Sequence, residues 1–172
     1  MPERIQLRRQ RGWRIPPGAV IVDRRTEFGN PFPVDGDWIT WTAVSLGYRG
    51  DAAGRRAASI ALYRAWITDA PVEPGPLAKP ADRDATVDYA DGSSAALGRV
   101  AMGFAEFASQ LVDQPPTWTR LKPTLEHIRS TLGGRALACW CRPDALCHGS
   151  VLLSLANPPD VQVLDEDDGA AL

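Results

Sequence analysis

The sequence predicts a single compact α/β domain in which helices flank a small, largely parallel sheet. A chain of 172 residues, 44% of them hydrophobic, is the size of one domain that can bury a core. Short apolar runs at 19–23 and 135–141 are typical of strands that are covered on both faces, as they are in parallel sheets. Segments with helical periodicity lie between these runs, and such alternation is typical of α/β proteins.

The first strands are expected close to the N-terminus. Residues Arg4 to Arg8 alternate charged and apolar side chains with the period of a half-buried strand, and a Pro-Pro-Gly turn at 16–18 ends this stretch. The β-branched run at 19–23 predicts a second strand that leads into a loop. We expect Trp38 and Trp41 to lie in the irregular stretch beyond that loop.

Helical periodicity predicts three helices in the middle of the chain. The first spans 51–67, with Asp51 as its N-cap, and the second spans about 94–112. The third spans about 119–132 and ends at a Gly-Gly pair, with His127 on its exposed side. Its expected buried stripe consists of Leu121, Leu125, Ile128 and Leu132.

The last predicted unit is a strand, a short loop and a helix. The buried strand covers 135–141, and the helix begins at Cys147 or His148 and continues to Asn157. We assign residues 1–158 to one α/β domain, in which the Pro- and Asp-rich stretch 69–92 forms a long loop insertion. Residues 159–172 form an acidic tail that is expected to be flexible.

Charge and composition narrow the class of protein. A formal net charge of −2 and a pI near 5.7 exclude a general polycation built for nucleic acid, so any basic surface must be local. The first 25 residues hold seven arginines against two acidic residues. The sequence has no apolar run long enough for a membrane span or a secretion signal, so we expect a cytoplasmic protein without a membrane partner.

A cluster of cysteines near the C-terminal end carries the strongest chemical signal. Cys139 and Cys141 share one face of the predicted strand because alternate strand residues point the same way, and Trp140 points to the other face. Cys147 and His148 then arrive at the start of the next helix, whose N-terminus stabilises thiolates.

Three interpretations of this cluster stay open at the sequence level. Cys139, Cys141, Cys147 and His148 have the number and type of ligands for a tetrahedral zinc site, with an iron–sulfur cluster as the alternative cofactor. Cys147 beside His148 is also suited to a reactive thiol with an adjacent base. The third interpretation is passive burial, since free cysteine is among the most buried residue types.

A second candidate site is the loop at 23–32. Arg24 and Arg25 bring forked donors suited to phosphate or carboxylate, while Asp23 and Glu27 are the available acid or base groups. A Gly-Asn-Pro sequence at 29–31 is expected to fix the loop's shape, with positive φ available at the glycine. Phe28 and Phe32 are suited to sandwich a base, or else to plug the core beneath an ordinary turn.

These motifs together resemble a known family. The resemblance rests on residues 4–9, Gly12-Trp13-Arg14, Val22-Asp23-Arg24, Phe28-Gly29-Asn30-Pro31-Phe32, Tyr63, Trp66, Leu137-Ala138-Cys139-Trp140-Cys141, Cys147-His148-Gly149, Leu152-Leu153 and Asn157. They resemble an uncharacterised bacterial and phage family, domain of unknown function 4326, over nearly the whole chain. The resemblance implies an α/β fold, and it carries no activity.

The functional expectation follows from where the two sites lie. Ligands of open α/β sheets bind outside the carboxyl ends of the strands, and both sites follow a predicted strand end. If the two strands are neighbours, the sites form one pocket. We expect an enzyme, a hydrolase or transferase, that acts on a nucleotide or nucleoside-like anionic small molecule.

The expected roles divide the residues into three sets. Substrate would be bound by Arg24, Arg25, Asn30, Phe32 and Trp140; catalysis would fall to Asp23, Glu27, Cys147 and His148; and metal would be held by the Cys3His set. The alternative is a metal-stabilised module that binds nucleic acid through the Arg-rich N-terminus. No feature predicts the oligomeric state or supports a purely scaffolding role.

Overall fold

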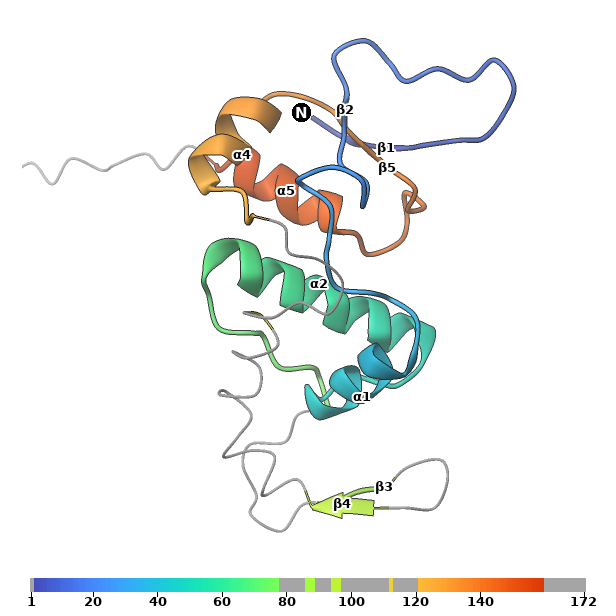
Figure 1. Cartoon of the computed structure of the whole chain (residues 1–172), viewed down its shortest axis with the longest axis vertical. Helices are drawn as coiled ribbons and strands as arrows, with labels where there is room; N and C mark the ends of the chain where they lie inside the picture. Colours follow the sequence, from blue (N-terminus) through green and yellow to red (C-terminus); the bar gives the residue numbers. More distant parts are fainter. Residues whose placement is uncertain (1, 78–85, 89–93, 97–111, 113–120, 160–172) are drawn as a thin grey trace, which may run out of the picture.

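The computed structural model describes residues 2–77, 86–88, 94–96, 112 and 121–159, and it shows a mixed α/β fold with a small parallel sheet (Figure 1). Most of the expected helix at 94–112 and nearly all of the expected acidic tail lie outside the described residues. Within the described chain, no helix is both long and apolar enough to cross a membrane.

The sheet is built from segments that are far apart in the sequence. Strands β1 (Arg4–Gln6), β2 (Val20–Ile21) and β5 (Leu137–Cys139) lie in the order β1-β5-β2, and both neighbours run parallel to β5. All of β5 is buried, because a central parallel strand is covered on both faces. The neighbouring predicted strands at 19–23 and 135–141 therefore end at the same edge of the sheet, as expected.

The helices begin where the sequence supplies a cap. Helix α2 (Ala52–Thr68) begins after Asp51, whose side chain accepts a hydrogen bond from the Gly54 amide at 2.8 Å. Helix α5 (His148–Ala156) follows Cys147, which is its N-cap. Helix α2 packs against α5, and both helices lie below the strands β1 and β5 in Figure 1.

Helix α4 (Leu125–Leu132) is shorter than the periodicity predicted. It packs against α5 and buries Ile128 and Leu132, as expected, and it ends at Gly133. The expected start near 119 is wrong, because Pro123 disfavours a helical conformation before it and Thr124 caps the helix. Leu121 lies before the helix and is 93% exposed, so it is not part of the buried stripe.

Helix α1 (Asp37–Ser45) corrects the expectation of an irregular stretch. It carries both Trp38 and Trp41, and it packs against α2. Ile39 and Ala43 are fully buried at a helical spacing of four residues, a short stripe that the flanking Gly and Pro residues obscure in the sequence.

The Pro-rich stretch after α2 is partly ordered against the domain. Val72 is buried, and the Gly75 amide donates to the Leu46 carbonyl at 2.7 Å. Farther along, β3 (Thr86–Asp88) pairs with β4 (Ser94–Ala96) in an antiparallel ladder. The chain at 94–96 is therefore a strand, where the sequence predicted the start of a helix.

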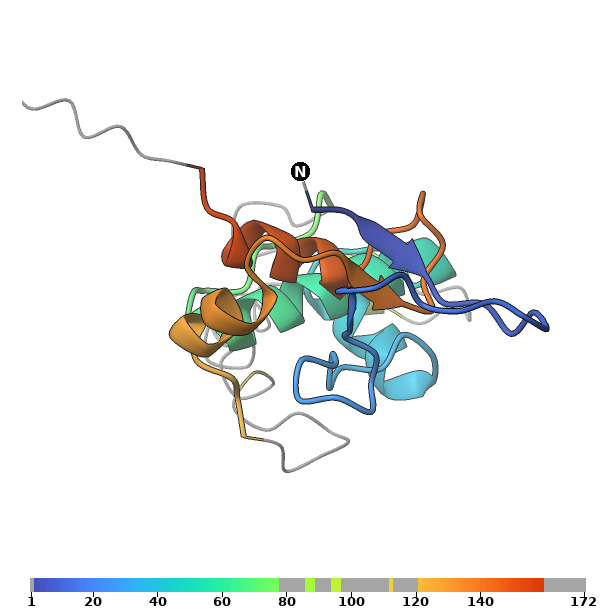
Figure 2. The same cartoon turned by 90° about the horizontal axis from the view of Figure 1, so that it is seen from above.

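The core lies between the sheet and the helices and includes the fully buried Tyr63 of α2. Its hydroxyl donates to the Phe28 carbonyl at 2.8 Å, which ties the loop after β2 to α2. By contrast, the connection from β1 to β2 extends away from the body of the molecule in both views (Figures 1 and 2).

Candidate functional site

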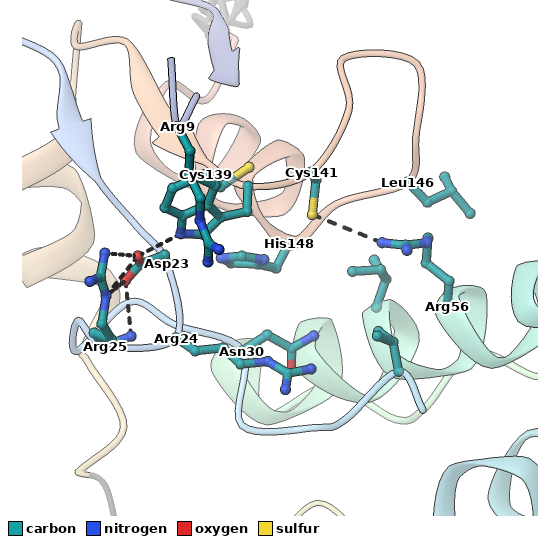
Figure 3. A pocket seen from close by; sticks show the side chains of 13 residues that line it. Arg9, Asp23, Arg24, Arg25, Asn30, Arg56, Cys139, Cys141, Leu146 and His148 are labelled. Atoms are coloured by element: carbon teal, nitrogen blue, oxygen red, sulfur yellow. Dashed lines mark hydrogen bonds and ion pairs between the residues drawn. The ribbon is translucent and has the colours of Figure 1, made fainter. Parts of the chain in front are cut away.

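A cavity of about 440 Å³ lies at the carboxyl ends of β2 and β5 (Figure 3). The loop after β2, the chain after β5, helix α2 and the β1–β2 connection all contribute to its wall. The lining residues are Arg9, Asp23, Arg24, Arg25, Asn30, Val34, Arg56, Ile60, Cys139, Trp140, Cys141, Leu146 and His148. The two sites predicted from the sequence thus meet in one cavity.

Asp23 is the most heavily hydrogen-bonded side chain of the cavity. Its carboxylate accepts bonds from the Arg25 backbone at 3.0 Å, from the Arg25 guanidinium at 2.6 Å and from the Trp140 indole at 3.1 Å. The side-chain bonds from Arg25 outweigh burial and hold the pKa of Asp23 below its ordinary value. Asp23 therefore stays ionised at neutral pH and positions Trp140 and Arg25.

Three other arginines bring positive charge to the same cavity. The Arg9 guanidinium lies 5.1 Å from the centre of the Trp140 ring, over its face, and Arg56 Nη1 lies 3.9 Å from Cys141 Sγ. Arg24 is exposed at the mouth. Within the described chain, none of Arg9, Arg24 and Arg56 forms an ion pair with a carboxylate, whereas Arg25 is neutralised by Asp23.

Asn30 lines the cavity, but its polar atoms are used within the protein. Its amide nitrogen donates to the carbonyl and hydroxyl oxygens of Ser59 at 3.3 and 3.0 Å, and its amide oxygen accepts from the Phe32 backbone at 2.8 Å. Asn30 therefore fixes the loop on α2. These bonds give it a positioning role, and its predicted contact with a substrate stays a prediction.

Gly29 is required for close packing, and its φ is not positive. A Cβ atom at this position would lie 2.5 Å from the Asp23 carbonyl oxygen and 2.6 Å from Arg24 Cα, much closer than van der Waals contact. The glycine lets the chain fold back on itself directly beneath Asp23 and Arg24. The positive φ that a glycine makes available is not used here, and steric exclusion of a Cβ atom is the reason for glycine.

Two candidate residues of this loop do not line the cavity. Phe32 is fully buried and stacks on Trp38 with 6.5 Å between ring centres, so the core interpretation holds for it. Glu27 points to α4, where its carboxylate lies 3.0 Å from His127 Nε2. His127, expected to be exposed, is half-buried because its ring also stacks on Phe28 at 5.5 Å.

The three cysteines converge as predicted, but the alternation of a strand is not the reason. β5 ends at Cys139, Cys141 follows it, and Trp140, expected on the opposite face, lines the same cavity. Their sulfur atoms all lie within 4.8 Å of one another, and those of Cys139 and Cys147 are 3.3 Å apart. Cys139 and Cys147 are buried, while Cys141 is half-buried and points towards Arg56 (Figure 3). Three thiols at this spacing are able to hold a metal ion.

Cys147 has the strongest thiolate character of the three. Hydrogen bonds from the Cys139 and Cys141 thiols lower its pKa against the opposing effect of burial, and the adjacent His148 lowers it further. The Gly149 amide of α5 also donates to its sulfur at 3.3 Å. The pKa of the Cys139 thiol is raised, first by its hydrogen bond to Cys141 and then by its hydrogen bond to Cys147. The thiolate is the form that binds metals.

His148 lies beside this cluster without joining it. Its Nε2–H donates to the Val22 carbonyl at 2.5 Å, and its ring meets the Tyr63 ring edge-on at 5.4 Å. The other nitrogen, Nδ1, lies 3.8 Å from Cys147 Sγ. In the described chain, however, the ligand atoms that are all within 4.8 Å of one another are only the three cysteine sulfurs. His148 is thus fixed by the residue that follows β2, and its ring nitrogens lie outside the group of three sulfurs.

Sequence reasoning missed Arg9 and Arg56 as parts of the site. Arg56 lies on the same face of α2 as Ile60 and Tyr63, at spacings of four and seven residues, so the helical period alone was a usable signal. No comparable signal exists for Arg9. It comes from an extended connection whose path depends on the tertiary structure, and it reaches the cavity by lying over Trp140.

The fold and site define a small α/β protein with an arginine-lined cavity beside a cysteine cluster. A family model, described as "Domain of unknown function (DUF4326)", matches residues 5–158, and the chain belongs to this family. No curated protein and no solved structure matches the chain.

Proposed function

We propose that this protein is an enzyme, a hydrolase or a transferase, that acts on a nucleotide or a nucleoside-like anionic small molecule. The observation that carries the proposal is the set of three arginines, Arg9, Arg24 and Arg56, that line one cavity without a carboxylate partner in the described chain. Concentrated positive charge in a concave site attracts anions. Guanidinium groups bind phosphate oxygens through paired hydrogen bonds.

The size and walls of the cavity support a ligand with an aromatic or apolar part. About 440 Å³ falls within the range of roughly 300–1,000 Å³ that is usual for small-molecule sites. The Trp140 indole is held by its hydrogen bond to Asp23 and offers a flat aromatic face. In this structure the Arg9 guanidinium lies over that face. Val34, Ile60 and Leu146 add apolar surface. A nucleotide has both a phosphate for the arginines and a base for such surfaces.

We further propose that the metal is zinc, bound by Cys139, Cys141 and Cys147. Zinc prefers thiolate ligands in tetrahedral geometry, and it needs no redox partner. A cytoplasmic location would keep the three thiols reduced and free to bind it. Elemental analysis of protein purified without a His tag and without oxygen tests this: about one zinc per chain and no visible colour supports it. Iron with visible absorption would instead indicate an iron–sulfur cluster.

Calorimetric titration with nucleoside monophosphates and the matching nucleosides tests the enzyme proposal. We expect the monophosphates to bind and the nucleosides to bind at least about tenfold more weakly, because each charged hydrogen bond is worth roughly 1.5–3 kcal/mol. Arg24→Ala and Arg56→Ala should each weaken monophosphate binding about tenfold or more. Arg64→Ala is the matched control, since Arg64 is exposed on the same helix and does not line the cavity.

Product analysis then separates an enzyme from a binding protein. Each monophosphate that binds is incubated with the protein, with and without a second nucleoside as acceptor, and the products are separated by chromatography. Release of base or phosphate supports a hydrolase, and transfer to the acceptor supports a transferase. Equal binding of nucleosides and monophosphates, or an unchanged affinity in both arginine variants, would refute the proposal.

A nucleic-acid-binding module is the second candidate. The specific observation in its favour is the projecting β1–β2 connection, on which Arg8, Arg9, Arg11 and Arg14 are all exposed. Binding through phosphates falls steeply with salt, so a steep loss of RNA or DNA binding between 50 and 200 mM salt would favour this candidate, roughly as expected for several phosphate contacts. Arg11→Ala should then weaken polynucleotide binding while mononucleotide binding stays unchanged.

A further inference from the structure

We infer that a metal ion bound by Cys139, Cys141 and Cys147 keeps one coordination position open to the arginine-lined cavity, where it takes an oxygen of an anionic ligand. The inference deepens the proposed function and rests on it, because it makes the metal part of the ligand site. It replaces the closed Cys3His site that the sequence suggested with a three-ligand site.

The spacing of the sulfur atoms suits a shared metal. With metal–sulfur bonds of about 2.3 Å in tetrahedral geometry, thiolate sulfurs are separated by about 3.8 Å. The Cys139 and Cys147 sulfurs are 3.3 Å apart, and all three lie within 4.8 Å of one another. Small side-chain rotations are enough to bring these sulfurs to metal-bound distances.

The neighbouring histidine lies outside the group of close ligand atoms in this arrangement. In the described chain the atoms that are all within 4.8 Å of one another are the three cysteine sulfurs alone. His148 uses Nε2 to donate to the Val22 carbonyl of the chain after β2, and Tyr63 packs edge-on against its ring. These two contacts fix the imidazole between the sheet and α2. They leave Nδ1 without a proton, 3.8 Å from Cys147 Sγ and outside the group formed by the three sulfurs. The described part of the chain contains no other His, Cys, Asp or Glu in the ligand group.

The direction of the free coordination position follows from which of the three cysteines line the cavity. Cys139 and Cys141 line the cavity, whereas Cys147 does not line it and caps α5. A metal bound by all three has Cys147 on its helix side, and its remaining position is directed to the cavity. Figure 3 shows the Cys141 sulfur directed towards Arg56, 3.9 Å from Nη1. A phosphate-type anion between the two would have one oxygen on the metal and another on the guanidinium.

Such an arrangement is typical of catalytic zinc. Closed four-ligand sites are structural, while catalytic sites use three protein ligands and leave one position for water or substrate. A metal in this position polarises the oxygen that it binds. The cysteine cluster would therefore serve the ligand directly, in addition to joining β5 to α5.

Cobalt substitution tests the open position independently of any activity. The full chain is loaded with Co²⁺, whose visible spectrum reports the number and type of its ligands, and it is titrated with azide and with inorganic phosphate. We expect both anions to change the cobalt spectrum. Arg56→Ala should weaken the phosphate response about tenfold and leave the azide response unchanged, since azide needs only the metal.

His148→Gln separates the three-ligand site from a Cys3His site. Glutamine retains a donor for the Val22 carbonyl and removes Nδ1, so the variant should bind Co²⁺ with the wild-type affinity and spectrum. A folded variant that binds Co²⁺ at least tenfold more weakly, or with a shifted visible band, would make His148 the fourth ligand and overturn the inference. If the variant does not fold, the azide titration of the wild type decides.

The remaining outcomes distinguish this inference from the proposed function. A cobalt spectrum that azide and phosphate leave unchanged means a closed site, and it overturns the inference while nucleotide binding measured by calorimetry still stands. Failure to bind cobalt at all overturns both the inference and the zinc proposal. An azide response without nucleotide binding supports the open position and overturns the nucleotide ligand.

Discussion

The Trp140 indole donates a hydrogen bond to the Asp23 carboxylate across 3.1 Å and 117 residues of sequence. Asp23 follows β2 and Trp140 follows β5, so this bond joins the ends of two neighbouring parallel strands. Because Asp23 also holds Arg25, one carboxylate sets the position of an aromatic and a cationic group at the same cavity mouth.

Replacing this carboxylate should produce a pH-dependent loss of stability. The folded-state pKa of Asp23 is lowered, so its stabilising effect is complete above the ordinary value of 3.8 and disappears as the pH falls through the folded pKa. Asp23→Asn should therefore be less stable by about 1–2 kcal/mol at pH 7, since hydrogen bonds to a charged group are lost. Below pH 3.8 the difference from the wild type should shrink.

Urea denaturation at pH 3 to 7 measures this difference. Asp144→Asn is the control, because Asp144 is exposed and pairs only with the exposed Arg142, so its replacement should change stability little at any pH. A difference for Asp23→Asn that stays constant over the whole range would show that the carboxylate's ionisation is not the source of the effect.

Gly29→Ala should destabilise the protein strongly. The new Cβ would lie 2.5 Å from the Asp23 carbonyl oxygen, and backbone cannot yield as a flexible side chain does. Overpacking of this kind costs typically about 1–3 kcal/mol and occasionally more. Gly50→Ala is the matched control, since its Cβ would make ordinary contacts of 3.4 and 3.6 Å to side-chain methyl groups. Thermal unfolding of both variants provides the comparison, and equal melting temperatures would refute the steric account.

Asn30→Ala should cost about 1–3 kcal/mol, because it leaves the buried Phe32 amide and Ser59 groups without their partner. Asn157 makes a similar pair of bonds, to the Gly134 amide and the Leu153 carbonyl, at a site that water reaches more easily. Asn157→Ala should therefore cost less in denaturant unfolding. A larger loss for Asn157→Ala would mean that Asn30 is not the anchor of its loop.

Metal removal should reveal which role each cysteine has. In the zinc-bound protein, serine replacement of any one of the three cysteines should reduce both the zinc content and the melting temperature, since the loss of one ligand weakens metal binding. The variants are Cys139→Ser, Cys141→Ser and Cys147→Ser. After chelation the wild type should melt at a lower temperature. In that state Cys141→Ser should be nearly neutral, because Cys141 is only half-buried, whereas the other two replacements bury a hydroxyl.

Elemental analysis and thermal unfolding of the same samples measure both effects. A zinc content that is unchanged by all three replacements would refute the cysteine site. Loss of zinc in only one variant would indicate that the other two cysteines are merely buried neighbours.

Local signals made much of the fold predictable. The strand at 19–23 has a continuous β-branched run, and the helices after Asp51 and Cys147 have apolar periodicity and an N-cap. All three elements are confirmed. Pairing of the strands at 19–23 and 135–141 also brought the two loop sites together as expected. The start of α4 was predicted too early because the apolar spacing continues on the N-terminal side of Pro123. The proline ring disfavours a helical conformation for the residue before it, so the helix begins only at Leu125.

The chemistry of individual side chains was harder to predict, because it depends on tertiary partners. Phe32 is aromatic in a loop, and only the packing of Trp38 shows that it belongs to the core. His148 follows a cysteine directly, yet the Val22 carbonyl holds its ring in a position outside the group of three sulfurs. Asn30 has the polar atoms of a ligand contact, and Ser59 uses them. In each case the deciding partner is at least six residues away along the chain.

The order of the strands in the sheet also has a consequence for how the protein is made. The middle strand, β5, is the last of the three to be synthesised, and β1 and β2 pair only with it. While the ribosome is still translating the first 136 residues, the two N-terminal strands have no neighbour in this sheet, and their backbone groups must remain hydrated or find temporary partners. Sheets closed by such distant segments form slowly. The cavity thus comes into existence only after β5 has been synthesised, when both of its loops are brought together by this one strand.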